Sequence, residues 1–145
     1  MSTPRIWLYQ QLTTFPGLVS LIGGPINPRV FAKKSMTSNQ EDHPFIVYKL
    51  GFKTTEDLAE VMPDEKDTYR QFAQVWVHDF TDQETGDYTR IDEVLHQVKL
   101  AVHNQGSAEH GVITARFIEV SQDLNDETLN TVFKYARLQL ITKET

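Results

Sequence analysis

The sequence contains no cysteine, which excludes disulfide bridges, thiolate metal ligands and cysteine nucleophiles. It also lacks an Asn-x-Ser/Thr acceptor for N-glycosylation, and its longest apolar runs, such as Phe45 to Tyr48, are far too short to span a bilayer. The stretch Met1 to Arg5 leads into an amphipathic segment and not into the apolar core of a signal peptide. We therefore expect a protein without a membrane partner, whose composition suits a reducing cytosol.

Positive charge is scarce as well. The chain has 14 Lys and Arg against 20 Asp and Glu, which gives a net charge of −6. Proteins that hold nucleic acid through their general surface are basic, because they must neutralise phosphates, so DNA binding as the main activity is disfavoured. The length of 145 residues and a hydrophobic fraction of 39% predict one globular domain over residues 1–145.

Motifs for catalysis are missing too. There is no H-E-x-x-H and no G-x-S-x-G, and the stretch Gly17 to Gly24 lacks the Lys-Ser/Thr of a phosphate-binding loop. His96 and His103 are two helical turns apart, about 10.5 Å, too far to share a metal ion, and both are expected as solvated histidines on the polar side of their helix. We expect no catalytic residue, no cofactor site and no metal site, and a protein that works by association and is not an enzyme.

What is present is a strand followed by an amphipathic helix, between Tyr69 and Asn104. From Tyr69 to Phe80, β-branched and aromatic residues are common, and Ala73, Val75 and Val77 alternate with Gln74, Trp76 and His78 with the period of two that is typical of a strand. After a polar turn, Thr89 and Asp92 resemble a capping box. The apolar residues that follow fall on one stripe of a helix: Ile91, Val94, Leu95, Val98, Ala101 and Val102.

The rest of the chain predicts an α+β fold. We expect a mixed, mainly antiparallel sheet flanked by an amino-terminal helix and the amphipathic helix, in the order α-β-β-β-α-β-β. Thr3-Pro4 is a typical helix start, and Gly51 indicates a bulge. Residues 121–127 are expected as a polar turn. The remaining elements are predicted at Pro4–Thr14 (helix) and at Arg29–Phe31, Phe45–Leu50, Val112–Val120 and Thr131–Thr142 (strands).

Two polar segments separate the predicted strands. Ala32 to His43 shows no periodicity and is expected to be a mobile loop. Thr54 to Asp67 carries five acidic residues before Lys66, which could suggest a metal site. Its spacing does not match an EF-hand, so a solvated hairpin tip or loop is the preferred interpretation.

Aromatic residues gather on the second face of the predicted strands. Tyr69, Phe72, Trp76 and Phe80 lie on one strand, and the last strand repeats the pattern with Phe133 and Tyr135. Either the amino-terminal helix covers this face, which we favour, or part of it is an interface rich in aromatics. Trp7 is likewise interpreted as an aromatic packed between helix and sheet, with a binding role as the alternative.

Set in order, these pieces resemble a known family. The quoted stretches are Phe15-Pro16-Gly17-Leu18 with Gly23-Gly24 and Arg29-Val30-Phe31, then Pro44-Phe45-Ile46-Val47-Tyr48, Gln74-Val75-Trp76-Val77 and the closing strand Thr131 to Ile141. Together they look like the tail terminator (tail completion) proteins of long-tailed bacteriophages. The acidic segment is longer than this family leads us to expect, which suggests an extended hairpin between the second and third strands.

The resemblance implies a structural virion protein assembled in the host cytoplasm. Such proteins form a ring, commonly a hexamer, that caps the head-proximal end of the tail tube, ends tube polymerisation and joins the tail to the head–tail connector or stopper. Genomic DNA would pass through the lumen without specific binding. Candidate interface residues are Arg29, Lys33 and Lys34 beside the loop 32–43, together with Trp76.

Two other functions stay open. One is a head-side connector or stopper protein in the neck, which is the same kind of task at the next ring. The other is a small enzyme or host-modulating protein. A buried His–carboxylate pair in a pocket would favour this last interpretation.

Overall fold

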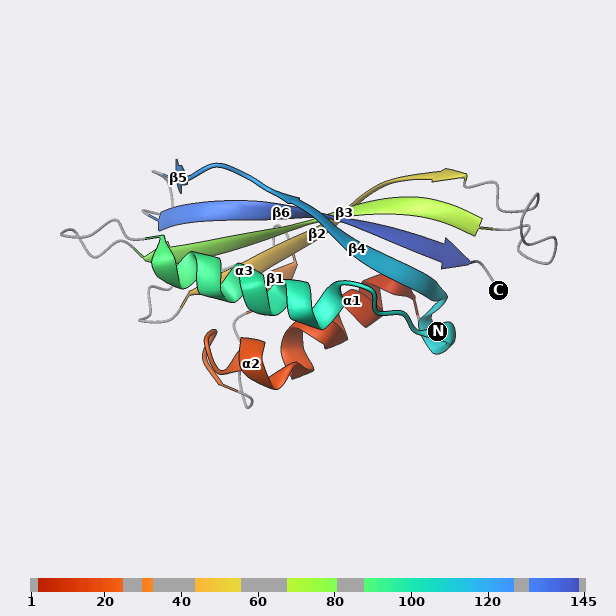
Figure 1. The fold of residues 1–145 in the computed structure, drawn as a ribbon, viewed down its shortest axis with the longest axis horizontal. Coiled ribbons are helices and arrows are strands. Elements are labelled where there is room, and N and C mark those ends of the chain that lie inside the picture. Colours follow the sequence, from red (N-terminus) through yellow and green to blue (C-terminus); the bar gives the residue numbers. More distant parts are fainter. Residues whose placement is uncertain are drawn as a thin grey trace.

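The computed structural model describes residues 3–24, 30–32, 44–55, 68–80, 88–126 and 131–143. It is an α+β fold in which a six-stranded sheet forms one layer and the helices form the other (Figure 1). The helices are α1 Pro4–Thr14, α2 Pro16–Val19, α3 Thr89–Val102 and the 3-10 turn η1 Ala108–His110. The strands are β1 Val30–Ala32, β2 Phe45–Thr55, β3 Thr68–Phe80, β4 Val112–Val120, β5 Leu124–Asp126 and β6 Thr131–Lys143.

The sheet has the order β1-β2-β3-β6-β4, with β5 also paired to β6. Only β1 and β2 are parallel among the described pairs, so the predicted mixed and mainly antiparallel sheet is confirmed. β3 and β6 pair over their full length, from Thr68 opposite Lys143 to Phe80 opposite Thr131. β2 and β3 pair out to Thr55 opposite Tyr69, which confirms the extended hairpin.

The amino-terminal helix begins and ends where the sequence predicts. Thr3 is its N-cap and accepts a hydrogen bond from the backbone N–H of Ile6 at 3.3 Å, and Pro4 occupies the first turn. Trp7, Leu8 and Leu12 are buried in the main core. Trp7 is therefore a packing residue, as the preferred interpretation held.

The start of α3 differs from the prediction. Its N-cap is Tyr88, without a side-chain cap bond, and Thr89 is already helical, so the expected capping box is wrong. Asp92 instead accepts a hydrogen bond from Lys134 Nζ at 2.6 Å. The helix start is held instead by Arg90, whose Nε donates to Asp79 at 2.8 Å. The predicted apolar stripe is confirmed, since all six of its residues are buried.

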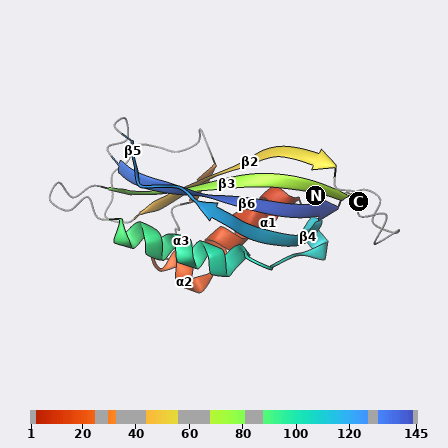
Figure 2. The same cartoon turned by 45° about the horizontal axis from the view of Figure 1, so that its top comes forward.

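Both long helices lie on the same face of the sheet (Figures 1 and 2). α1 packs beside α3, and Leu8 and Leu12 share one core with Val75 and Val77 of β3. The favoured expectation that α1 covers the aromatic face is therefore wrong. The sequence does not distinguish the two faces, because an apolar stripe specifies burial and not the side of the sheet on which it is buried.

Three smaller points complete the fold. The register of β2 against β3 shifts between Leu50 and Lys53, which confirms a bulge at Gly51. Residues 124–126, expected within a polar turn, form β5 and pair with β6. In the described ranges, no helix is long and apolar enough to cross a membrane.

Candidate assembly surface

The sheet face opposite the helices carries a group of aromatic side chains that we call the open face. On it, Phe52 and Phe72 have ring centroids 5.0 Å apart, and Trp76 and Tyr135 have centroids 6.4 Å apart. Phe52 is 65% exposed. Among the residues that the structure describes, no helix covers these rings (Figure 2). The second sequence-based alternative, an interface rich in aromatics, is the one that this geometry favours.

The bulge at Gly51 explains why Phe52 belongs to this face. Before the bulge, Tyr48 and Leu50 lie on the helix side of β2, opposite Val75 and Ala73. Strict alternation would send Phe52 to the same side. The extra residue of the bulge reverses the alternation and brings Phe52 against Phe72. Sequence reasoning noted the bulge but missed this consequence.

The aromatic rings are accompanied by positive charge. Arg137 lies with its guanidinium carbon 5.4 Å from the Phe72 ring centroid and makes an ion pair with Glu119 at 2.8 Å. A hollow of about 310 Å³ opens between Phe52, Phe72, Tyr135 and Arg137. By strand register, the same face also carries Lys49, Arg70 and Arg116. By the same register, Lys143 opposite Thr68 and Asp126 opposite Thr131 lie on this face as well. In the described strands the open face therefore combines aromatic surface with five cations and two acids, Glu119 and Asp126.

His78 closes one end of the row of aromatic residues on the open face. Its ring stacks between Phe45 and Phe133, each with its centroid 4.9 Å away. Its Nδ1 lies 2.8 Å from Thr131 Oγ1. Burial disfavours the charged imidazolium and lowers the pKa of His78 to about 4, although the charge of Asp126 acts in the opposite direction. His78 is therefore neutral at pH 7 and serves as a packed ring in this cluster.

The other histidines bear on the enzyme hypothesis. His96 is exposed, as expected. His103, expected as a solvated residue, is half-buried, and its Nδ1 accepts a hydrogen bond from the backbone N–H of Phe117 at 3.0 Å, which ties the end of α3 to β4. His110 is buried with its Nδ1 2.8 Å from Ser107 Oγ. That serine also exchanges two backbone hydrogen bonds with Val112, so this pair stabilises a tight loop.

A carboxylate partner for these histidines is missing in the described part of the chain. Neither His78 nor His110 hydrogen-bonds to an acidic side chain there. Nor does any group of three or more His, Asp and Glu side chains in the described ranges come together as a metal site would require.

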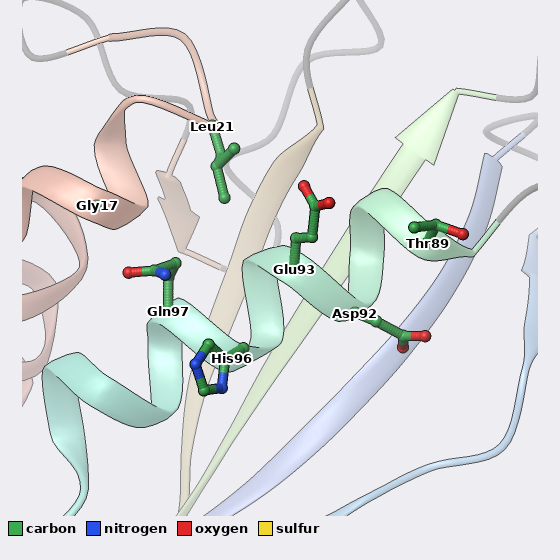
Figure 3. Close-up of a pocket in the computed structure, with 7 residues that line it drawn as sticks. All are labelled: Gly17, Leu21, Thr89, Asp92, Glu93, His96 and Gln97. Carbon is green, nitrogen blue, oxygen red and sulfur yellow. The ribbon is translucent and has the colours of Figure 1, made fainter.

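A second hollow, of about 490 Å³, lies on the helix side between α2 and α3 (Figure 3). Glu93, His96 and Gln97 line it from α3, and Gly17 and Leu21 line it from the α2 segment. A Cβ added to Gly17 would lie 2.3 Å from Gln97 Oε1, which shows how closely the two helices approach here. In Figure 3 the polar side chains that line this hollow point in different directions and do not converge on one point, as those of a catalytic site would.

The predicted interface residues fare differently. Trp76 lies on the open face, where the aromatic pair with Tyr135 holds it. Arg29, Lys33 and Lys34 lie outside the described residues, as do most of the loop 32–43 and of the acidic segment. Tyr69 was assigned to the wrong face, because it is an odd number of residues from Trp76 on an unbulged strand, and Lys53 Nζ lies 4.3 Å from its ring centroid.

Comparison with known proteins gives a likeness in structure alone. No protein-family model matches the sequence, and no curated protein matches it. Among solved structures, the chain is similar to one from a structure titled "Virion of native gene transfer agent (GTA) particle". The two share 12% identity with a TM-score of 0.58, over 94% of this chain and 92% of the other. At that identity the likeness establishes a common fold over nearly the full length of both chains.

Proposed function

We propose that this chain is a structural protein of a phage-like virion, and within that class a tail terminator. The observation that carries the proposal is the fold shared, from end to end, with a chain of a GTA virion. In this role the chain forms a homo-oligomeric ring, hexameric by family resemblance, on the head-proximal end of the tail tube. The ring ends tube polymerisation and meets the head–tail connector or stopper.

Two features of the molecule support an assembly role over a catalytic one. The open face presents aromatic and arginine side chains, a combination that is enriched at protein interfaces. In the described ranges the hydrogen-bond partners of the buried His78 and His110 are the hydroxyls of Thr131 and Ser107 and not carboxylates, so these histidines support packing and loop structure. The net charge of −6 also suits a lumen through which DNA passes without specific binding, since few phosphate contacts would form.

The test is native mass spectrometry of the purified protein over a range of concentrations, alone and with isolated tail tubes. We expect a closed ring, alone or on the tubes, together with tubes of fixed length when the protein is present during polymerisation. A stable dimer that ignores the tubes would refute the proposal and return attention to an enzyme or host-modulating protein.

A second experiment separates the terminator from a connector or stopper. Immunogold labelling of tails isolated before head joining should place the terminator at one tail end. A connector or stopper would instead label heads and leave such tails bare. Deleting residues 33–43, with Lys33 and Lys34, should impair joining if this segment meets a neighbour, whereas normal tail length and head joining would remove it from the interface.

A further inference from the structure

The charges of this chain are separated between its described scaffold and the remaining residues. The described residues contain ten Lys and Arg against seven Asp and Glu, whereas the remaining residues contain four against thirteen. The described residues therefore form a basic scaffold, although the whole chain has a net charge of −6. Its cations include Lys49, Arg70, Arg116 and Arg137 on the open face.

The strongest concentration of negative charge lies within the acidic segment Thr54 to Asp67, in its twelve-residue stretch 56–67. It holds six carboxylates and one cation, Lys66. It also holds Leu58, Val61 and Met62, side chains that can contact aromatic rings. Its chemistry thus complements the open face in both charge and apolar character.

We propose that the open face of one copy binds the acidic segment of a second copy of this chain. The contact site is the hollow between Phe52, Phe72, Tyr135 and Arg137, extended by Trp76. Carboxylates of the segment pair with Lys49 and Arg137, and its apolar side chains lie against the rings. This inference rests on the proposed ring and identifies the contact through which neighbouring subunits recognise each other.

Reach along the chain favours a second copy over the same one. The segment leaves β2 at Thr55 and returns at Thr68, and Thr55 lies opposite Tyr69. A twelve-residue stretch whose ends meet can extend about 20 Å at most, since each residue spans about 3.4 Å. Trp76 lies seven residues along β3 from Tyr69, about 23 Å at 3.3 Å per residue. The segment of the same copy therefore reaches Phe52 and Phe72, three residues from Thr55 and Tyr69, but only just reaches the Trp76–Tyr135 pair, whereas a second copy can lie along the whole row.

The arrangement also suits a ring. Each copy offers one open face and one acidic segment, so the contact joins two different surfaces in a head-to-tail manner. Such heterologous contacts generate closed rings when the rotation between neighbours is a simple fraction of a turn. Nucleic acid is a weaker candidate for this face, because the whole chain carries a net charge of −6, and because Leu58, Val61 and Met62 of the segment can contact the exposed rings as a phosphate backbone cannot.

The test is a charge exchange between the two surfaces. The face variant is Lys49→Glu with Arg137→Glu, two residues whose side chains are not buried. The segment variant is Glu60→Lys, Asp64→Lys and Glu65→Lys. The control, Arg5→Glu with Lys99→Glu, makes the same change of charge on exposed positions of α1 and α3. Sedimentation velocity and native mass spectrometry report self-association, and circular dichroism reports folding.

We expect each variant to weaken self-association by about tenfold or more, whereas the control stays within about twofold of the wild type, because attractive contacts become repulsive only at the proposed interface. Combining the face and segment changes in one chain should restore association. If the face variant forms rings as stably as the wild type does, the proposed contact is overturned, while the proposed function remains intact. A wild type that neither forms rings nor binds tail tubes would instead refute the proposed function.

A labelled peptide of residues 54–67, titrated into the full-length protein, decides the contact even in that second case. Binding to the wild type and the control, and at least tenfold weaker binding to the face variant, would support it. Absence of peptide binding would overturn it. If the wild type binds oligothymidylate and the face variant does not, the open face is a nucleic-acid surface and the contact is overturned. The contact is also overturned if the acidic segment cross-links only to the face of its own copy.

Discussion

Acidification should destabilise this fold through His78. The ring is 6% exposed, stacks between Phe45 and Phe133, and has its pKa lowered from 6.5 to about 4 by burial. A base whose pKa is lower in the folded state binds its proton more readily when unfolded. The corresponding stability is therefore complete above pH 6.5 and is lost as the pH falls towards 4.

The size of the effect follows from the pKa of His78, which is about 2.5 lower in the folded protein than its ordinary value of 6.5. At 1.36 kcal/mol per unit, the full loss is about 3 kcal/mol, of which about 2 kcal/mol is gone at pH 5. Urea unfolding at pH 7.5, 6 and 5, followed by circular dichroism, measures this change as a shift of the transition midpoint. Acidic side chains elsewhere also titrate, so the wild type alone does not isolate His78.

The variant His78→Phe supplies the comparison. Phenylalanine retains the stacking but cannot titrate, and it leaves the hydroxyl of Thr131 without its partner, so this variant starts from a lower stability. Between pH 7.5 and 5 it should lose about 2 kcal/mol less than the wild type. The exposed control His96→Gln should follow the wild type. If the wild type and His78→Phe lose equal free energies of unfolding between pH 7.5 and 5, the assignment of a buried neutral histidine is refuted.

Three further changes test the packing. Leu138→Ala, at a fully buried position of β6, should cost about 2–5 kcal/mol in urea unfolding, because it leaves a cavity in the core. Thr3→Ala removes the N-cap of α1 and should cost about 1 kcal/mol, whereas Thr3→Ser should cost little. Gly111→Ala should destabilise by more than about 1 kcal/mol on thermal melting, since Gly111 has a φ of 73° and an added Cβ would lie 2.7 Å from the Lys143 carbonyl oxygen. A melting temperature equal to the wild type would contradict this last expectation.

Local patterns in the sequence predict the elements well. The stripe from Ile91 to Val102 defines α3, alternation around Val75 defines β3, and Thr3-Pro4 places the start of α1. These features depend on neighbours within a few residues. The class of fold could therefore be inferred before the structure was known, whereas the extended β2–β3 hairpin followed from the family resemblance, through the unexpected length of the acidic segment.

The errors concern contacts between distant residues. The side of the sheet that α1 covers depends on how Leu8 and Leu12 meet residues some 60 positions later, and no local pattern carries that information. The predicted cap of α3 is wrong because the helix begins one residue earlier, at Thr89, and Asp92 pairs with Lys134, which lies far along the chain. The open face was visible in sequence as aromatic residues, but its actual membership, with Phe52 and without Tyr69, depends on the bulge and on strand register.

The place of β6 in the sheet has a consequence for how the protein is made. This strand lies between β3 and β4 and also pairs with β5, yet it follows all of them in the chain. During synthesis, β3 and β4 therefore lack the strand that joins them until Thr131–Lys143 has left the ribosome. Contacts between segments so far apart form slowly, because the intervening chain must first be ordered. Sheet completion is thus a late event, and partial chains have no means of presenting a finished open face to a neighbour.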